Sequence, residues 1–333
     1  MKKLLIYNGT ILLFLLLLLE GGLKLFNTDY QYYERTYAAK FPEKAAYQID
    51  SNWVKSEPDL GWVCQQKTHL KFYRQDFFDV KYQINQEGFR MQRDLDDLQK
   101  TARKRILLLG DSFLFGIFLE NQQTISAKLQ QQLGEDYEVF NLAIPGWGID
   151  QMYQAYEKYV AQIQPDQVIL LFIDDDLQRT VEAFFWGATT KRAYHLVNGQ
   201  LAFRTPTDGS LNAIESSFVF NFQIVNRLYH YWHQQQGIHL SKAIFNQLGS
   251  REKGRGKPLT ILRIPRKEQV LQNDCFQTNL THFLKNQDIK FDDLIEPFKG
   301  QTHPIDYLYL PNDDHLSEKG TALVAKCLFD SVW

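Results

Sequence analysis

The sequence predicts an α/β protein with a parallel sheet that helices cover on both faces. Short apolar runs recur along the second part of the chain, and stretches with helical periodicity separate them. The runs lack the in-out alternation of half-exposed strands. Strands that are apolar at successive positions are buried on both faces, as parallel strands between two helical layers are. The runs predicted as strands are residues 106–109, 139–142, 168–173 and 259–264.

The chain begins with a segment predicted to be a membrane helix. Lys2 and Lys3 precede an apolar stretch, residues 4–26, that contains five consecutive leucines. Its length suits one bilayer crossing, and no small-residue cleavage site follows the leucines. An uncleaved signal anchor over residues 1–26 is therefore favoured over a cleaved signal peptide or a buried helix. The two lysines predict a cytoplasmic N-terminus, which places the rest of the chain on the exported side, periplasmic or extracellular.

Residues 27–103 form a predicted accessory segment that packs on the core. The segment is rich in Tyr, Phe, Lys and Asp and has no long helical period. Within it, residues 78–84 alternate between apolar and polar side chains, which is the period of a half-buried strand. We expect this strand to belong to an aromatic hairpin.

The α/β pattern occupies residues 104–333, with an insertion at about 182–257. The insertion contains an Asn198-Gly199 turn and an aromatic helix over residues 222–232, and we expect it to lie over the edge or the active face of the sheet. His230 and His233 belong to that helix, and their aromatic neighbours indicate packing instead of metal binding. Ser317 is the predicted N-cap of the last helix. Helices are predicted at residues 124–133, 151–163, 268–284 and 321–329.

The composition excludes several classes of function. The 37 Lys and Arg residues balance 39 Asp and Glu residues, so the chain has no basic footprint for nucleic acid. The three cysteines are too few and too scattered for a disulfide framework or a zinc site. No glycine-rich dinucleotide fingerprint or phosphate-binding loop follows a predicted strand, so we expect no cofactor.

Polar residues follow the predicted strands at four places. Ligands of an open parallel sheet bind at the carboxyl ends of its strands, so these places are where chemistry is expected. Each has a simpler explanation when taken alone: a serine that caps a helix, a Pro-Gly turn, acids that begin a helix or bind a metal, and a surface histidine. The four segments are Gly110-Asp111-Ser112, residues 141–148 (in which Ala-Ile-Pro precedes Gly146), Asp174-Asp175-Asp176, and residues 312–315, which end in Asp313-Asp314-His315.

Taken together and in this order, the four segments resemble the conserved blocks of the SGNH (GDSL-type) hydrolase superfamily. The resemblance covers about residues 58–333, including Asn85-x-x-Gly88-Phe89-Arg90 ahead of the first strand. It implies a flavodoxin-like three-layer αβα fold. It also implies that Ser112 is a nucleophile, that His315 is its general base and that Asp313 orients the imidazole. Backbone N–H groups of Ser112 and Gly146 are expected to stabilise the oxyanion, and Asp111 is expected to brace the turn.

The sequence departs from the family pattern at two positions. The family acid usually stands three residues before the histidine, where this chain has Asn312, and the favoured acid here is Asp313 at two residues. The family oxyanion Asn corresponds to Asp175, whose carboxylate accepts hydrogen bonds and cannot donate them when ionised. We expect that Asp175 is protonated, that another donor replaces it, or that activity is weak.

The resemblance implies an ester hydrolase that acts through the triad on acyl esters, of envelope carbohydrate or of lipid. One alternative is an O-acyltransferase that uses the same serine and passes the acyl group to a sugar hydroxyl. A second alternative is a non-catalytic carbohydrate-binding or scaffold protein on a degenerate SGNH fold, which the acid at Asp175 motivates. The partners expected are a small-molecule or carbohydrate ester and a membrane at the N-terminal helix, without nucleic acid.

Overall fold

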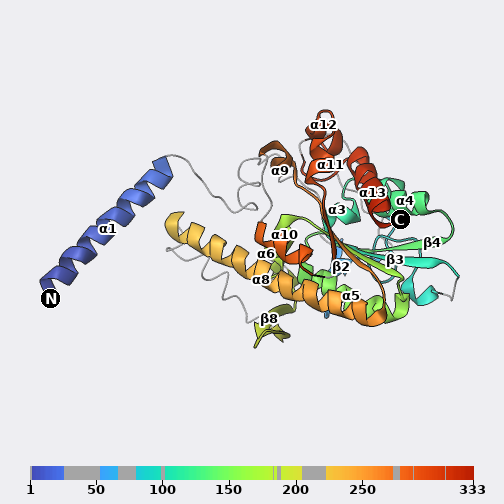
Figure 1. Cartoon of the computed structure of the whole chain (residues 1–333), viewed down its shortest axis with the longest axis horizontal. Coiled ribbons are helices and arrows are strands. Elements are labelled where there is room, and N and C mark those ends of the chain that lie inside the picture. The colour runs from blue at the N-terminus through green and yellow to red at the C-terminus, as the bar shows by residue number, and fades with distance from the viewer. Residues whose placement is uncertain are drawn as a thin grey trace. The chain divides into compact units, whose positions relative to one another are not determined.

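The computed structural model describes ten stretches of the chain, and its element order is shown in Figure 1. They are residues 2–25, 53–66, 80–98, 102–182, 184–185, 189–204, 223–272, 278–287, 289–311 and 313–333. Two compact units make up the structure. One, the sheet unit, comprises residues 47–206 and 236–333, and the other comprises residues 1–46 and 207–235.

A five-stranded parallel sheet lies at the centre of the sheet unit, as predicted. The strand order is β4-β3-β5-β10-β11, and every neighbouring pair is parallel. Numbered along the chain, this order is 2-1-3-4-5, which is the flavodoxin-like order. The strands are β3 (Lys104–Gly110), β4 (Tyr137–Ala143), β5 (Gln167–Phe172), β10 (Leu259–Arg263) and β11 (Lys290–Asp293). The first four confirm the predicted strands, and β11 was not predicted.

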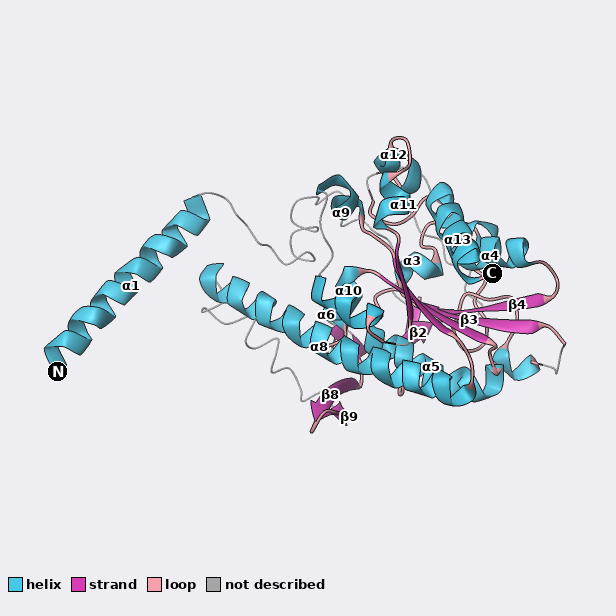
Figure 2. Cartoon of the chain, in the orientation of Figure 1, coloured by secondary structure: helices cyan, strands magenta, loops and turns pink. Residues whose placement is uncertain are grey.

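Helices cover both faces of this sheet, so the three-layer prediction is confirmed. In Figure 2, α4 (Ile125–Leu133) and α13 (Glu318–Val332) lie on one side of the strands, and α5 (Ile149–Ile163) lies on the other. The second half of α8 (Gln223–Arg255) also packs here, since the Phe245 ring lies 5.8 Å from that of Phe172. Ser317 caps α13 by accepting the N–H of Gly320 at 3.2 Å, as predicted.

The predicted helix over residues 268–284 is wrong as a single element. The structure has two helices there, α9 (Lys267–Gln272) and α10 (Thr278–Lys285), and residues 273–277 lie outside the described part. The other short helices are α3 (Ser112–Phe115), α6 (Asp174–Arg179), α11 (Ile295–Lys299) and α12 (Pro304–Leu308), with single 3-10 turns at Leu95–Asp97 and Asn121–Gln123.

The described residues of the accessory segment are built into the same core. β1 (Val54–Glu57) and β2 (Gly61–Cys64) form an antiparallel hairpin. The Trp62 ring N–H donates to the carbonyl of Pro145 at 3.1 Å, and the Trp147 ring N–H donates to the carbonyl of Trp62 at 3.1 Å. This reciprocal pair ties the hairpin to the turn after β4.

The predicted strand over residues 78–84 is not a strand where the structure describes it. Val80, Tyr82 and Ile84 are buried and the residues between them are exposed, so the alternation was correct. No described strand pairs with this segment. Its contacts are made by side chains instead: the Tyr82 hydroxyl accepts the backbone N–H of Phe118 at 2.7 Å. Residues 78 and 79 lie outside the described part.

In the part of the insertion that the structure describes, there are two small hairpins and a long helix. The hairpins are β6 (Phe184–Phe185) with β7 (Thr189–Thr190), and β8 (Ala193–Val197) with β9 (Gln200–Arg204). Asn198 and Gly199 have φ values of 51° and 78°, as a two-residue hairpin turn requires. The aromatic helix is much longer than predicted, because α8 continues to Arg255.

The unit that contains the N-terminus holds α1 (Lys2–Leu25) and the first part of α8. The Ile224 N–H donates to the Glu20 carboxylate at 3.1 Å, and the ring of Tyr229 stacks on that of His233 at 5.3 Å. A helix is therefore present over most of residues 1–26. Among the described residues, however, no helix combines the length and the apolar character that a bilayer crossing requires.

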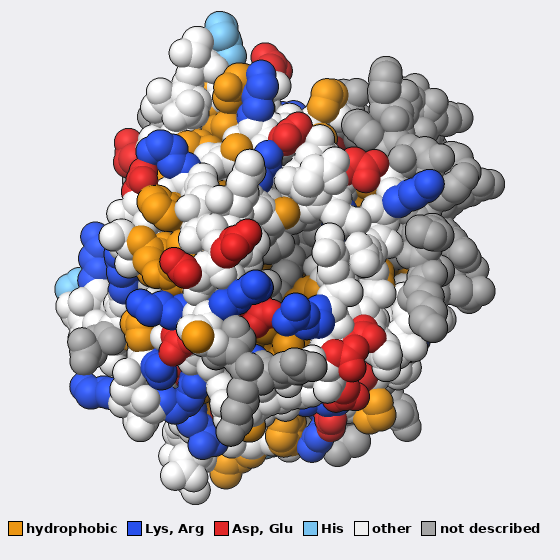
Figure 3. All heavy atoms as spheres, turned by 90° about the vertical axis from the view of Figure 1, so that its right-hand side faces the viewer, with side chains coloured by type: hydrophobic (Ala, Val, Ile, Leu, Met, Phe, Trp, Pro, Cys, Tyr) orange, Lys and Arg blue, Asp and Glu red, His pale blue; other side chains and the backbone are white. Residues whose placement is uncertain are grey.

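Charged side chains of both signs occur on the face of the molecule in Figure 3. This distribution agrees with the nearly balanced charge of the chain, which has a formal net charge of −2.

Candidate active site

Two of the four predicted segments meet and form a connected triad of Ser112, His315 and Asp313. Ser112 Oγ lies 2.9 Å from His315 Nε2, and His315 Nδ1 lies 2.6 Å from Asp313 Oδ1. Because an ionised carboxylate only accepts hydrogen bonds, Nδ1 carries the ring proton. Nε2 of the neutral ring is then free to accept the proton of Ser112, which is the orientation that a general base needs.

The turn after β3 places Ser112 at the first position of α3. Asp111 caps this helix, since its Oδ1 accepts the N–H of Phe113 at 2.9 Å, and its Oδ2 lies 3.2 Å from Ser112 Oγ. Gly110 is required at the strand end because a Cβ there would lie 2.8 Å from the side chain of Leu114. The serine is thus held on a tight turn in which the Leu114 side chain leaves no room for a side chain at Gly110.

His315 is held by its own backbone and by two phenylalanine rings. Its N–H donates to Asp313 Oδ1 at 2.8 Å, and its carbonyl accepts the N–H of Leu310 at 2.9 Å. The rings of Phe113 and Phe118 lie 5.1 and 6.2 Å away. Burial lowers the pKa of His315, but the charge and hydrogen bond of Asp313 outweigh burial, and the net pKa is raised above 6.5.

The structure brings Asp313, and not Asp314, to the histidine. The Asp314 carboxylate instead accepts a hydrogen bond from Arg266 Nη2 at 3.0 Å. Asn312, the position of the usual family acid, lies outside the described residues. The two-residue spacing between acid and histidine therefore produces a bonded pair within one turn of chain.

The second segment forms a turn beside this site. The Trp147 N–H donates to the carbonyl of Ile144 at 3.3 Å, Pro145 occupies the second position, and Gly146 has φ of 80°. These are the features of a type II turn, which needs glycine at its third position. Asn141 of β4 braces the serine helix, because its amide donates to the carbonyl of Leu114 at 3.3 Å.

Each aspartate of the third segment pairs with an arginine. Asp174 makes a two-point contact with Arg263, at 2.7 and 3.0 Å. Asp175 makes a two-point contact with Arg266, at 2.9 and 3.1 Å. Arg266 therefore places a positive charge directly beside the Asp175 carboxylate.

The third aspartate, Asp176, is fully buried and lies in the first turn of α6. Its Oδ2 accepts the N–H of Ile173 at 3.0 Å, and its Oδ1 accepts Arg179 Nη1 at 2.7 Å. Of the two explanations open for these acids, a helix start is what the structure contains. Among the described residues, no group of three or more acidic, His or Cys side chains is placed to hold a metal ion.

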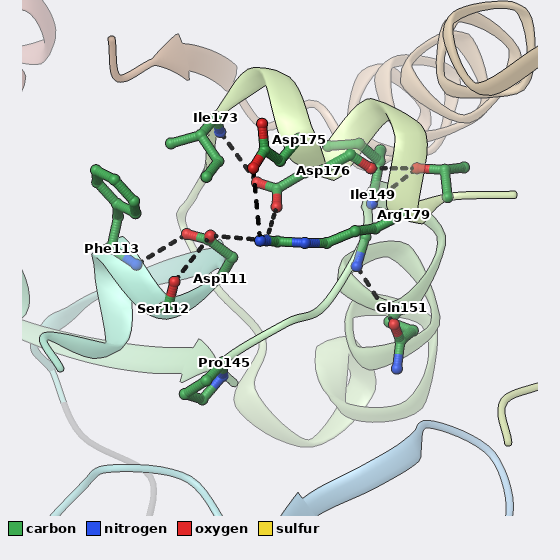
Figure 4. Close-up of polar contacts among 12 residues, drawn as sticks. Asp111, Ser112, Phe113, Pro145, Ile149, Gln151, Ile173, Asp175, Asp176 and Arg179 are labelled. Atoms are coloured by element: carbon green, nitrogen blue, oxygen red, sulfur yellow. Dashed lines mark hydrogen bonds and ion pairs between the residues drawn. The ribbon is translucent and has the colours of Figure 1, made fainter. Parts of the chain in front are cut away.

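Arg179, the last residue of α6, is a site residue that sequence reasoning missed. Its Nη1 also lies 3.2 Å from Asp111 Oδ2, so Arg179 joins the third segment to the serine turn (Figure 4). Burial lowers the pKa of Arg179, but the charges of Asp176, Asp175 and Asp111 more than offset this, and its pKa is raised. The sequence signal was its position three residues after Asp176, a spacing that is also ordinary for a surface helix.

Arg90 of the Asn85-x-x-Gly88-Phe89-Arg90 motif is the second residue whose role the sequence did not predict. It is buried and donates to the carbonyls of Phe115, Gly116 and Leu119, at 3.0 and 2.5 Å for the first two. These carbonyls belong to the end of α3 and the loop that carries Phe118. This motif, which precedes the first strand of the parallel sheet, therefore holds the loop that follows the Ser112 helix.

Comparisons with known proteins give fold-level similarities only. No family model matches the chain, and no curated protein matches it. Similar solved structures include TesA, with a TM-score of 0.42 at 12% identity, covering 69% of this chain and 98% of that one. The acetyl xylan esterase AlAXEase has a TM-score of 0.42 at 14% identity, covering 69% and 100%. A lipolytic protein of the G-D-S-L family from Desulfitobacterium hafniense has a TM-score of 0.38 at 14% identity, covering 69% and 100%.

Proposed function

We propose that the chain is a serine esterase that cleaves acyl esters through Ser112, His315 and Asp313. The observation that carries the proposal is the unbroken contact from Ser112 Oγ to His315 Nε2 at 2.9 Å and from His315 Nδ1 to Asp313 at 2.6 Å. Ser112 lies about 200 positions before Asp313 and His315 in the sequence, and the three meet in the order that nucleophilic catalysis needs. The names of the similar structures include esterases and lipolytic proteins, which agrees with this chemistry.

In the proposed reaction, Ser112 Oγ forms a bond to the ester carbonyl carbon while His315 Nε2 takes the hydroxyl proton. Asp313 stabilises the imidazolium ion that results. The tetrahedral intermediate then expels the alkoxide, which receives the proton from Nε2, and an acyl group remains on Ser112. In the second half, water attacks the acyl-enzyme with His315 again as base, and the acid and free serine are released.

The neutralisation of Asp175 supports an active site over a degenerate one. An unpaired carboxylate beside the serine would oppose the negative charge that develops on the carbonyl oxygen. Here Arg266 forms two hydrogen bonds with Asp175. The departure from the family pattern is therefore accompanied by a compensating charge from the end of the neighbouring strand β10.

Hydrolysis of p-nitrophenyl acetate by the full chain tests the proposal. We expect turnover by the wild type and a loss of at least about 10³-fold in Ser112→Ala. Ser331→Ala, at the far end of α13, is the matched control and should keep the wild-type rate. A folded wild type without turnover of short acyl esters would contradict the proposal. Acylation of an added sugar would show instead that the protein is an O-acyltransferase.

For the natural substrate, we propose acyl esters of envelope carbohydrate or lipid, with the sheet unit on the exported side of a membrane. The support is the resemblance to the superfamily and the two lysines ahead of the leucine run. Fusion of alkaline phosphatase to the C-terminus should give an active reporter if the unit is exported. An inactive fusion, with an active cytoplasmic reporter at the same point, would contradict this location.

A further inference from the structure

The proposed reaction places negative charge on the substrate carbonyl oxygen, and the third strand end lacks the amide that the SGNH pattern supplies there. Its counterpart, Asp175, has only acceptor oxygens when ionised. We infer that the guanidinium group of Arg179 supplies this missing donor and stabilises the oxyanion. The inference rests on the proposed function, since it concerns the transition state of that reaction.

The position of Arg179 next to the nucleophile is the first argument. Its Nη1 lies 3.2 Å from Asp111 Oδ2, and the same carboxylate oxygen lies 3.2 Å from Ser112 Oγ. Figure 4 shows the side chain reaching from the end of α6 toward the Asp111-Ser112 turn. One carboxylate oxygen therefore separates the guanidinium group from the attacking hydroxyl.

The second argument is the donor capacity that remains on Arg179. A guanidinium group has five N–H donors, and the two on Nη1 are directed to Asp111 and Asp176. Within the part of the chain that the structure describes, Nη2 makes no hydrogen bond. The nearest acid oxygen to Nη2, on Asp175, is 3.9 Å away, which is beyond hydrogen-bond length. A quarter of the side chain is exposed, whereas Asp176 behind it is fully buried.

The third argument is that the group is held in place before substrate arrives. Asp111 and Asp176 fix Nη1 from two sides, and Lys191 Nζ donates to the backbone carbonyl of Arg179 at 2.5 Å. Gly148 lets the backbone of the second segment lie close to the backbone of Arg179, because a Cβ at position 148 would be 2.7 Å from the carbonyl carbon of Arg179. A charged donor that is already fixed in a partly buried site needs little reorganisation free energy when the oxyanion forms. This preorganisation is the condition for effective electrostatic catalysis.

A structural role is the competing explanation, because Arg179 also neutralises two buried acids. The two roles differ in what a substitution changes. A structural residue affects folding, or substrate binding and turnover together, whereas an oxyanion donor affects kcat with KM little changed. An oxyanion donor can also be replaced by another donor at the same place.

The test uses the full chain with p-nitrophenyl acetate as substrate. We expect Arg179→Gln to lower kcat by about 10²–10³-fold, as loss of one oxyanion donor does elsewhere, with KM changed by less than about twofold. Arg179→Lys keeps the charge and should retain more activity than Arg179→Gln. Arg251→Gln, an exposed arginine of α8 paired with Glu157, is the matched control and should have the wild-type rate.

Two rescue measurements separate the donor role from a folding defect. Methylguanidinium at millimolar concentration should restore part of the kcat of Arg179→Ala and leave the wild type unaffected. Adding Asp175→Asn to Arg179→Gln should also raise kcat, because the new amide can donate where the carboxylate could not.

The inference is overturned if folded Arg179→Gln keeps kcat within about threefold of the wild type while Ser112→Ala is inactive. It is also overturned if activity is lost and neither methylguanidinium nor Asp175→Asn restores any of it. A wild type without Ser112-dependent turnover would remove the proposed function itself, and the inference with it.

Discussion

At the scale of single residues, the pairing of Asp175 with Arg266 affects the charge balance near Ser112. A negative charge at this position would raise the barrier to oxyanion formation, and Arg266 offsets it through two hydrogen bonds. Arg266 also contacts Asp314, so one arginine links the third strand end to the segment that carries the histidine. The site therefore contains several acidic side chains, each of which pairs with a basic side chain.

Arg266→Gln should therefore leave Asp175, among the described residues, with only its longer ion pair to Arg179, at 3.9 Å, and lower kcat by about tenfold, or about 1.4 kcal/mol in the barrier. The loss should shrink as salt is added, since ions screen partly exposed charges. Steady-state kinetics at two ionic strengths measure this, with Lys267→Gln at the next position as control. A loss that does not depend on salt would contradict the electrostatic explanation.

The raised pKa of His315 predicts the direction of the pH dependence. The reaction needs neutral imidazole, so kcat/KM should increase with pH through a midpoint above 6.5. Asp313→Asn removes the charge that raises this pKa. The midpoint should then fall, and kcat should drop by roughly 10⁴-fold because the tautomer is no longer fixed. A wild-type midpoint below 6.5, or one that Asp313→Asn leaves in place, would contradict the assignment.

At the scale of elements, the loop after α3 depends on one buried arginine. Arg90 donates to three of its carbonyls and to Asn121 Oδ1 at 3.0 Å, and its guanidinium group lies 4.1 Å from the centre of the Tyr82 ring. Phe118 of this loop packs against His315. The motif that contains Arg90 thereby reaches His315 through two contacts.

Arg90→Met should destabilise the sheet unit by about 3 kcal/mol or more, because buried carbonyls lose charged donors. The melting temperature should fall by roughly 6–12 °C, measured by circular dichroism. Arg93→Met is the control and should change little, because the Arg93 side chain is half exposed and, within the described residues, pairs only with Glu138. Equal effects of the two substitutions would show that burial of Arg90 is not what matters.

The sequence predicts an element correctly where a local pattern of apolar and polar side chains is enough to determine it. The strands from Ile106 and Val168 are continuous apolar runs, and both were predicted. β11 (Lys290–Asp293) has three charged residues in four, and pairing with β10 makes it a strand against its composition. Residues 80–84 show the reverse case, in which a strand-like alternation pairs with no strand in the described part of the chain.

The residues of the candidate site also fall into those that a local pattern predicts and those that it does not. The positions of Ser112 and His315 could be predicted because their segments follow strands or precede a helix in a fixed order. The role of Arg179 could not, because its two acid partners come from different segments and only the fold brings Asp111 beside α6. Long-range polar contacts of this kind leave no local signal in one sequence.

At the scale of the whole molecule, the sheet unit extends well ahead of the first strand of the sheet. The paired tryptophans Trp62 and Trp147 are both buried, and Gln151 of α5 donates to the carbonyl of Leu60 at 2.8 Å. The hairpin thus shares a core with the turn that carries Gly146. It is part of the unit that begins at residue 47.

A chain that begins at residue 47 should therefore fold with a cooperative melting transition, whereas one that begins at residue 104 should not. The shorter chain would expose the apolar surface that Trp62 and its neighbours cover, and burial of such a side chain is worth about 3–5 kcal/mol. Circular dichroism melts of both chains measure this. A cooperative transition in the chain from residue 104 would show that the hairpin is dispensable.

The central claim is that Ser112 is an activated nucleophile, and covalent labelling with a fluorophosphonate probe tests it most directly. Peptide mass spectrometry of the labelled full chain should find the phosphonyl adduct on Ser112. Labelling should be absent in Ser112→Ala and strongly slowed in His315→Ala, because the base no longer accepts the hydroxyl proton. A folded wild type that stays unlabelled, or an adduct on another residue, would contradict the account.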